Sequence, residues 1–176
     1  MLRGEKIVLR ARSEADVPVL HTELHDDVAT RSRADSRPWR PIASGQGSPY
    51  AVPKPSDGAA VFSVERLSDG ELAGEALLWN IDLHNRVAHI GISLRPSHRG
   101  CGLGTDVVAV FCRYAFAILG LHRLQIETLA DNLAMQRAAM HSGFVVEGTL
   151  RHSAWVEAEF VDEVVLGLLA TEWRMT

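Results

Sequence analysis

The sequence predicts a mixed α/β or α+β fold, with a mainly antiparallel central sheet flanked by helices. Apolar residues alternate with a period of two in the first half of the chain and again near its end, as strands require. After residue 104 the apolar period changes to about 3.6, which indicates helix. A glycine-rich loop, residues 99–104, stands at that change. At 176 residues the chain is expected to form a single domain, residues 1–176.

The chain opens with a predicted strand and helix. The stretch "KIVLRARS", residues 6–13, alternates apolar and polar residues as a half-buried strand does. Ser13 followed by Asp16 resembles a capping box and predicts a helix that runs through His25.

Residues 31–58 are predicted to be irregular because they hold five of the seven prolines, together with several glycines and serines. A loop this long is usually functional or disordered. It also contains Trp39 and Tyr50. We therefore interpret it as a lid or substrate loop rather than a linker.

Three strands are predicted next. "AAVFSVERL", residues 59–67, and "ELAGEALLWNI", residues 71–81, flank a turn at residues 68–70, and "RVAHIGISL", residues 86–94, follows a turn at residues 84–85. Strands joined by turns this short predict an antiparallel meander.

The second half alternates helix and strand. A broad apolar face predicts a helix over residues 105–119, ended by Gly120. The pattern then predicts a strand over residues 123–130, a helix over residues 133–142 and two final strands within residues 152–169.

Composition narrows the class of protein. Apolar residues make up 47% and charged residues 23%, as in soluble globular proteins, and no run approaches the roughly 20 apolar residues that span a bilayer. We expect a cytoplasmic protein with no membrane partner. The net charge of −4 and the lack of a Lys/Arg block argue against nucleic acid and suit an amine partner. Cys101 and Cys112 are expected to be free thiols.

The glycine loop indicates an anion site, because it joins a strand to a helix whose first amides are free. A P-loop is excluded, since Thr105 and Asp106 follow Gly104 where lysine is required. A dinucleotide fingerprint would need glycine at position 105 and an earlier place in the chain, although Glu127 mimics its ribose-binding acid. A tight turn without ligand is the structural alternative.

The loop resembles a third pattern. Arg99-Gly100-Cys101-Gly102-Leu103-Gly104 is similar to the R/Q-x-x-G-x-G/A signature of the GNAT superfamily of N-acetyltransferases. Residues 80–170 resemble the later elements of that family, and "KIVLRA" and "LAGEALLW" resemble its opening strands. The pattern formed by Asn132, residues 142–144 and residues 147–148 is similar to that of the RimJ/RimL branch of the family, which acetylates protein N-termini and small amines.

The resemblance implies acetyl-CoA as cofactor. It implies splayed strands beside which the pantetheine arm lies, a pyrophosphate held by loop amides, and Asn132 bonded to the pantetheine. A helix N-cap is the alternative role for Asn132. The implied cofactor-binding residues are Ile92, Ser93, Leu94, Arg99, Gly100, Cys101, Gly102, Leu103, Gly104, Thr105, Asn132 and Met135.

The implied reaction is direct attack of an amine on the thioester, with no metal and no covalent intermediate. His89 stands where the family commonly has a glutamate base, and Glu75 is the reserve; a strand histidine facing solvent and an exposed structural glutamate are the alternatives. Met135 stands where the branch often has a serine near the coenzyme sulfur, and methionine donates no proton. The remaining candidates to protonate the leaving coenzyme sulfur are Ser142, Tyr114 and water.

The acceptor is expected to be a small amine or a peptide N-terminus. Trp39, Tyr50, Trp79 and Trp155 are candidates to line its cleft, with core or edge packing as the alternative. Glu157, Glu159, Asp162 and Glu163 are candidates to attract it, with a solvated hairpin as the alternative. A non-catalytic acyl-CoA-binding module is the competing function. The sequence leaves open a monomer or a homodimer.

Overall fold

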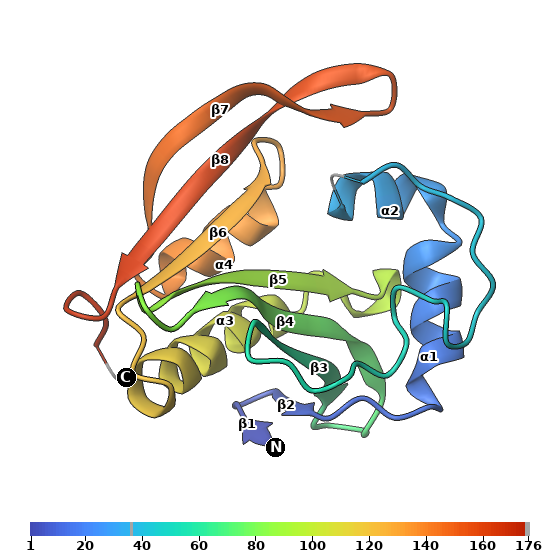
Figure 1. The fold of residues 1–176 in the computed structure, drawn as a ribbon, viewed down its shortest axis with the longest axis horizontal. Helices are drawn as coiled ribbons and strands as arrows, with labels where there is room; N and C mark the ends of the chain where they lie inside the picture. Colours follow the sequence, from blue (N-terminus) through green and yellow to red (C-terminus); the bar gives the residue numbers. More distant parts are fainter. Residues whose placement is uncertain (36, 175–176) are drawn as a thin grey trace.

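In the computed structural model, which describes residues 1–35 and 37–174, eight strands form one sheet in the order β1-β2-β3-β4-β5-β6-β8-β7 (Figure 1). Neighbouring strands pair antiparallel, except that β5 and β6 are parallel. The strands are β1 (Leu2–Arg3), β2 (Ile7–Arg10), β3 (Ala59–Arg66), β4 (Leu72–Asp82), β5 (Val87–Leu94), β6 (Arg123–Leu129), β7 (Val145–Val156) and β8 (Glu159–Leu169). The predicted mixed fold with a mainly antiparallel sheet is confirmed.

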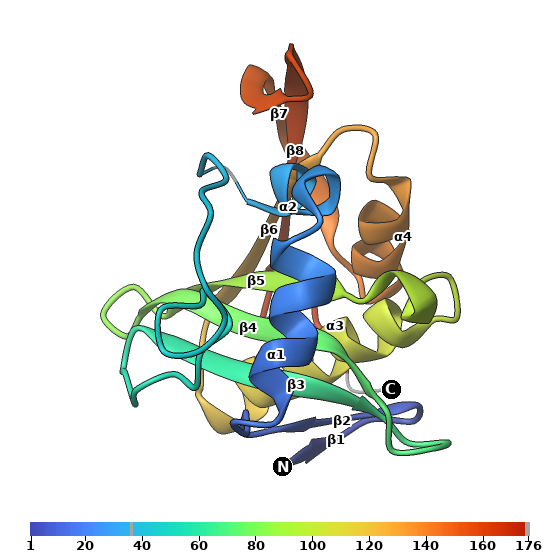
Figure 2. The ribbon, with the colours of Figure 1, turned by 90° about the vertical axis from the view of Figure 1, so that its right-hand side faces the viewer.

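The helices flank this sheet. They are α1 (Asp16–Leu20), which continues as a π-helical turn over His21–His25, α2 (Val28–Ala34), α3 (Leu103–Arg113), which continues as a π-helical turn over Tyr114–Ile118, and α4 (Leu133–His141). Figure 2 shows α3 and α4 on one side of the sheet and the segment after α2 on the other. The helices within residues 1–35 and 37–174 include no candidate membrane span.

The predicted irregular segment, residues 31–58, begins too early. α2 covers residues 28–34, so the irregular part that the structure describes is residue 35 and residues 37–58; Ser36 lies outside the described residues. Asp27 starts this helix, because its carboxylate accepts hydrogen bonds from the backbone N–H and the hydroxyl of Thr30, at 3.2 and 2.7 Å. The short strand β1 was also not predicted.

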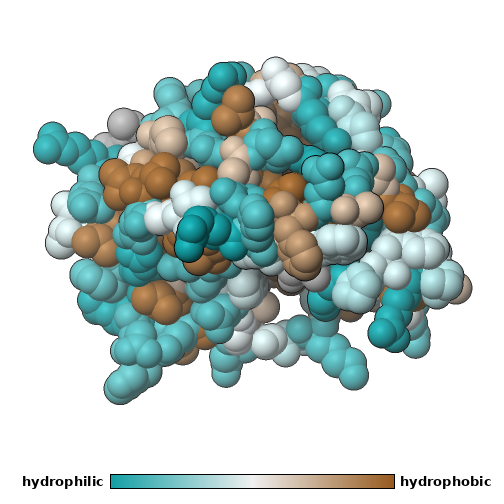
Figure 3. Space-filling view, turned by 90° about the horizontal axis from the view of Figure 1, so that it is seen from above, coloured by the Kyte–Doolittle hydropathy of each residue, from teal (hydrophilic) through white to brown (hydrophobic). Residues whose placement is uncertain are grey.

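The surface is mainly hydrophilic on the face that Figure 3 shows, with hydrophobic side chains in separate groups among the polar ones. The long hairpin of β7 and β8 extends away from the rest of the sheet (Figure 1). Trp155 and Phe160 face each other near its tip and are each 60% exposed.

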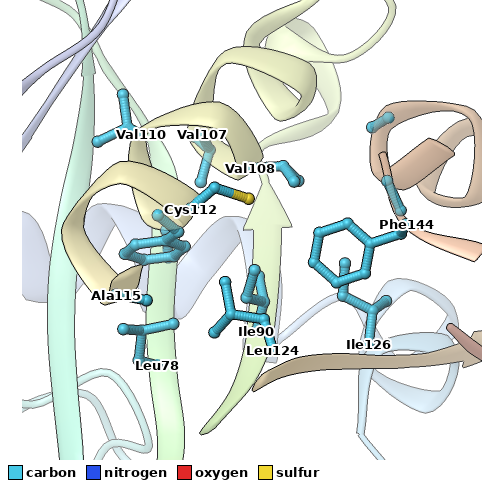
Figure 4. Close-up of a cluster of buried hydrophobic side chains, with 14 of the residues drawn as sticks. Leu78, Ile90, Val107, Val108, Val110, Cys112, Ala115, Leu124, Ile126 and Phe144 are labelled. Carbon is cyan, nitrogen blue, oxygen red and sulfur yellow. The ribbon is translucent and has the colours of Figure 1, made fainter. Parts of the chain in front are cut away.

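The main core lies between α3 and the sheet (Figure 4). Val107, Val108 and Phe111 repeat on one helix face, so all three meet the apolar side chains of the central strands, such as Ile90 and Leu124. Cys112 lies in this core, where burial raises the pKa of its thiol to about 12. Both cysteines are free, as predicted.

The parallel pair β5 and β6 is short. Its register runs only from Val87 opposite Arg123 to His89 opposite Gln125, whereas β4 accompanies β5 as far as Leu94. The edge of β5 beyond His89 therefore has no ladder partner in β6. This is the splayed arrangement that the resemblance implied.

The N-terminal hairpin is fastened to the first turn of α3 by one carboxylate. Asp106 accepts hydrogen bonds from the backbone N–H groups of Glu5, Lys6 and Ile7, at 3.1, 2.7 and 3.0 Å. A side chain at Gly4 would collide with it, since a Cβ there would overlap Asp106 Oδ2. The turn between β1 and β2 therefore lies against the glycine loop.

Replacing Asp106 with alanine should lower the free energy of unfolding by about 2 kcal/mol, because three N–H donors lose a charged acceptor. Urea denaturation followed by circular dichroism measures this. Asp57→Ala is the matched control, since Asp57 is exposed and its carboxylate accepts no hydrogen bond within residues 1–35 and 37–174. Equal unfolding free energies for the two variants would contradict the anchoring role.

Candidate functional site

The glycine loop presents the open start of α3. Gly100 and Gly102 have φ values of +78° and +82°, which residues with side chains rarely adopt. Gly102 is the N-cap of α3 and has no side chain with which to cap it, so the amides of the first turn are free to bind a ligand. The partial positive charge at this helix start favours an anion.

The packing of the protein does not require glycine at position 104. A Cβ at this position would have Leu94 Cδ1, at 3.9 Å, as its nearest neighbour, which is an ordinary contact. The missing side chain therefore leaves room for a ligand to approach the helix backbone. This space fits a diphosphate.

A groove of about 1250 Å³ opens at this loop. Ten of the twelve residues that the resemblance assigned to the cofactor line it: Ile92, Leu94, Arg99, Gly100, Gly102, Leu103, Gly104, Thr105, Asn132 and Met135. Ser93 and Cys101 do not line it. The Cys101 thiol instead lies 3.2 Å from the backbone carbonyl of His98.

The groove is basic although the chain carries a net charge of −4. Lys6 contacts the loop from another part of the chain, with Nζ donating a hydrogen bond to the carbonyl of Cys101 at 3.2 Å. A Cβ at Gly102 would lie only 2.8 Å from that Nζ. The groove is lined by Arg3, Lys6, Arg99, Arg113, Arg137 and Arg174, and its only acidic residues within the described chain are Glu5 and Asp106.

These features fit coenzyme A, whose nucleotide carries a diphosphate and a further phosphate and whose pantetheine arm carries amides. The helix start and Lys6 suit the diphosphate, and the unpaired edge of β5 suits the amides. Sequence reasoning missed Lys6, because it lies 95 residues before Cys101 and only the strand pairing brings the two together. No local motif marks it.

Asn132 is the N-cap of α4. Its Oδ1 accepts a hydrogen bond from the backbone N–H of Met135 at 3.2 Å, and its Nδ2 donates to Thr128 Oγ1 at 2.9 Å. The N-cap alternative is therefore confirmed. Asn132 also lines the groove, where its remaining lone pair faces no other partner in the described residues.

His89 lies on β5, in the last residue pair before β5 and β6 part. Its ring packs against that of Trp79 in a tilted arrangement, with ring centroids 4.4 Å apart and an interplanar angle of 43°. Nδ1 is buried without a hydrogen bond and lies 3.7 Å from Glu127 Oε1, whereas Nε2 lies 3.4 Å from Asn80 Nδ2. The side chain is 14% exposed, so the alternative of a solvent-facing histidine is wrong.

The environment of His89 favours its neutral form. Burial lowers the pKa of its imidazole, the negative charge of Glu127 acts in the opposite direction, and the positive charge of Arg123 lowers it further. A neutral imidazole near pH 7 is able to accept a proton.

Glu75 is held in an ion pair. Its Oε2 lies 2.6 Å from Nη2 of Arg12, and the two side chains are 14% and 1% exposed. Burial raises the pKa of Glu75, and the charge of Arg12 opposes that rise. A carboxylate that compensates a buried guanidinium is a poor candidate for a base. The alternative of an exposed glutamate is also wrong.

Among the three proposed sources of the leaving-group proton, the structure favours Ser142 over Tyr114. The Ser142 hydroxyl is buried, has no hydrogen-bond partner in the described residues and belongs to the groove lining. Tyr114 does not line the groove and packs edge-on against Phe62. Met135 does line it.

The four aromatic residues predicted to line an acceptor cleft are dispersed. Trp79 contacts His89, and Trp155 pairs with Phe160 at the hairpin tip, with ring centroids 4.8 Å apart. Tyr50 is 1% exposed and packs among buried leucines, so its predicted place on a cleft surface is wrong. Trp39 donates a hydrogen bond from Nε1 to the carbonyl of His25 at 2.8 Å.

An ion pair joins α2 to the loop before α4. Arg33 donates to Asp131 Oδ1 at 2.6 Å, next to Asn132 in the chain. The hydrogen bond to Asp131 raises the pKa of Arg33, and the charge of Glu157 at the hairpin tip adds to this effect. Two segments distant in sequence therefore meet next to Asn132, which lines the groove.

Comparison with known proteins gives one family. The model of the acetyltransferase (GNAT) domain matches residues 6–145. Two curated relatives come from Bacillus subtilis: a probable N-acetyltransferase, YjcK, is 32% identical over 109 residues, and a putative ribosomal N-acetyltransferase, YdaF, is 34% identical over 108 residues. Each match covers 61% of this chain, and the chain spans only 60% and 59% of their respective lengths.

A solved structure has the same fold. The spermidine N-acetyltransferase from Vibrio cholerae, in complex with CoA and spermine, superposes with a TM-score of 0.78 and 21% sequence identity. The superposition covers 96% of this chain and 98% of that one.

Replacing Lys6 with glutamine should raise the dissociation constant for coenzyme A about fivefold to tenfold, because one charged contact to phosphate is worth about 1 kcal/mol. Isothermal titration calorimetry measures this. Lys54→Gln is the control, since Lys54 is exposed and outside the groove. The difference should shrink as salt rises. Equal affinities of Lys6→Gln and the wild type for coenzyme A would show that Lys6 does not contribute to binding.

Proposed function

The chain belongs to the acetyltransferase (GNAT) family, and from that premise we propose that it transfers the acetyl group of acetyl-CoA to a primary amine. The observation that carries this proposal is the uncapped start of α3, which opens into a basic groove beside the unpaired edge of β5. Acetyl-CoA, when bound, supplies the acetyl group as a thioester.

The backbone provides most of the cofactor site. The amides of the first turn of α3 bind the diphosphate, with Lys6 beside them. The free edge of β5 from Ile90 to Leu94 binds the amides of the pantetheine arm as a neighbouring strand would. Met135, from α4, packs against the arm.

His89 is the base in this proposal. Amines are protonated near neutral pH and must lose a proton before the nitrogen attacks the thioester carbonyl. His89 accepts that proton, directly or through water. Trp79 packs against the ring and fixes its orientation, and Glu127 faces Nδ1 and stabilises the imidazolium that forms.

The leaving thiolate takes a proton from Ser142 or from water. Ser142 has a free hydroxyl in the groove lining, whereas Met135 at the position usual for a serine donates nothing. Glu75 plays a structural role with Arg12.

The acceptor amine reaches His89 across the side of the sheet opposite α3. Among the relatives, one is named as a ribosomal N-acetyltransferase and another as a spermidine N-acetyltransferase. Both suggest a primary amine as acceptor. The acidic side chains of the β7–β8 hairpin would attract either a polyamine or a peptide N-terminus; they are Glu157, Glu159, Asp162 and Glu163.

We also infer that residues 1–176 act as one catalytic unit in the cytoplasm and that residues 37–58 form a lid over the acceptor. The Arg33–Asp131 ion pair, just before that segment, supports a closed arrangement next to the groove. The two free cysteines suit a reducing compartment.

The test is thiol release from acetyl-CoA with a panel of amines: spermidine, a peptide with a free N-terminus and simple alkyl amines. Because Cys101 is exposed and reacts with thiol reagents, each reaction needs a matched sample without amine. Turnover with one class of amine supports the proposal and names the acceptor. Binding of coenzyme A with no turnover on any amine would favour the non-catalytic module instead.

Replacing His89 with glutamine should lower kcat by a factor on the order of 10² to 10⁴, the usual contribution of a general base. The dissociation constant of coenzyme A should stay within about twofold, because the cofactor is held elsewhere. Steady-state kinetics and calorimetry check the two values. His84→Gln, in an exposed turn, is the control. An unchanged kcat in His89→Gln would show that His89 is not the general base.

Replacing Glu127 with glutamine should move the acidic limb of the kcat/KM profile to lower pH. The reason is that Glu127 opposes the lowering of the His89 pKa, and the variant loses that opposition. His89 then stays neutral, and able to accept a proton, further into the acidic range. A limb that does not move, or that moves to higher pH, would show that the titrating group is not His89.

A further inference from the structure

Two buried histidines of the chain take no part in the proposed reaction. His21 and His25 lie four residues apart in the π-helical turn after α1, and each is 2% exposed. Their ring centroids are 4.7 Å apart. One ring nitrogen of each and a carboxylate oxygen of Asp26 all lie within 4.8 Å of one another.

The hydrogen bond at Nε2 of His25 determines whether Nδ1 of the same ring carries a proton. Nε2 lies 3.1 Å from the backbone carbonyl of Arg40, which only accepts hydrogen bonds, so Nε2 carries the proton. Nδ1 therefore presents a lone pair. It is buried and has no hydrogen-bond partner in the described residues. A buried acceptor without a partner is uncommon, and this lone pair is available to a group that the described residues do not supply.

His21 is arranged in a similar way. Its Nδ1 lies 2.7 Å from the hydroxyl oxygen of Ser48, and that oxygen also accepts the backbone N–H of Tyr50 at 3.0 Å. Its Nε2 lies 3.0 Å from the carbonyl oxygen of Ile42 and 3.3 Å from Asp26 Oδ1. Because the Ile42 carbonyl only accepts hydrogen bonds, the ring proton of His21 lies on Nε2, and Nδ1 accepts from the Ser48 hydroxyl. Binding of a cation would require that proton to move to Nδ1, where the Ser48 oxygen can accept it, and Nε2 would then face the cation together with the Ile42 and Asp26 oxygens.

We propose that His21 Nε2, His25 Nδ1 and the Asp26 carboxylate bind a divalent transition metal ion of the zinc type, with the Ile42 carbonyl or water as a further ligand. Two imidazoles and one carboxylate are a usual zinc ligand set. Histidines that bind metal usually have the other ring nitrogen hydrogen-bonded, as both do here.

The distances suit this proposal. Ligand atoms about 2.0 to 2.1 Å from a tetrahedral zinc ion lie roughly 3.3 Å from one another. His21 Nε2 already lies at similar distances from two oxygens, 3.0 Å from Ile42 O and 3.3 Å from Asp26 Oδ1. The widest separation in the set, within 4.8 Å, must shorten on binding. Asp26 is the mobile ligand, since its side chain is 51% exposed and both imidazoles are buried.

Such an ion would fasten residues 37–58 to α1. The groups that bond the two rings, from Arg40, Ile42 and Ser48, all belong to that segment, and Trp39 bonds the carbonyl of His25. Figure 1 shows the segment passing beside α1. The site is separate from the cofactor groove, whose lining contains none of the three proposed ligands. Its role is to hold the proposed lid.

The test uses the full chain without a histidine tag, stripped with EDTA and titrated with ZnCl₂ by calorimetry and with CoCl₂ by absorption. The expected result is about one ion per chain, with the visible absorption of four-coordinate cobalt and a higher melting temperature in the presence of zinc. Asp26→Asn should weaken binding at least about tenfold.

Two further variants make the test sharp. His25→Gln keeps a donor for the Arg40 carbonyl but removes the ligand, and should bind no zinc at this site. His84→Gln is the control, since His84 lies in an exposed turn and should bind as wild type does. Should His25→Gln fail to fold, the exposed Asp26→Asn variant decides alone. Absence of zinc uptake by the wild type, or equal uptake by Asp26→Asn, would overturn the proposal.

Discussion

The structure depends on the early parting of β5 from β6. β6 pairs with β8 along its whole length, whereas it accompanies β5 only as far as His89. Backbone groups that lose a ladder partner need another one, because an unpaired buried N–H or C=O is costly. In the proposed function the amides of the pantetheine arm supply such partners along the edge of β5, and the loop after β5 places the start of α3 at its end. Strand topology and the helix start together define the cofactor groove, and no single side chain is decisive.

Burial separates the two candidate bases. Burial disfavours charge, so it raises the pKa of Glu75 and lowers that of His89. Glu75 is nevertheless committed to Arg12, a partner 63 residues away in sequence. The carboxylate that faces His89, Glu127, lies farther away, at 3.7 Å, and burial favours a neutral imidazole at the point where the strands part. From the sequence, the family resemblance favoured His89, and Glu75 was only the reserve candidate.

Local sequence patterns predicted most of the helices and strands. They predicted few of the features that depend on contacts between residues far apart in the sequence. Apolar periodicity located the meander and α3, and glycine spacing located the loop. Proline content hid α2, although Asp27 before Thr30 was an available cap signal. Lys6 could not be assigned, because its contact with Cys101 follows from strand pairing and from Asp106. Tyr50 looked like a surface aromatic in a polar segment, and only packing against α1 and the turn that follows it buries it.

The most direct test concerns Gly104, where a side chain fits the protein but would occupy the space assigned to the cofactor. Coenzyme A binding to Gly104→Val should weaken by at least about tenfold with little change in melting temperature, since a Cβ meets only an ordinary contact at this position. Gly104→Ala, which the family signature accepts, should bind nearly as wild type does. Wild-type affinity in Gly104→Val would contradict the placement of the diphosphate at the start of α3.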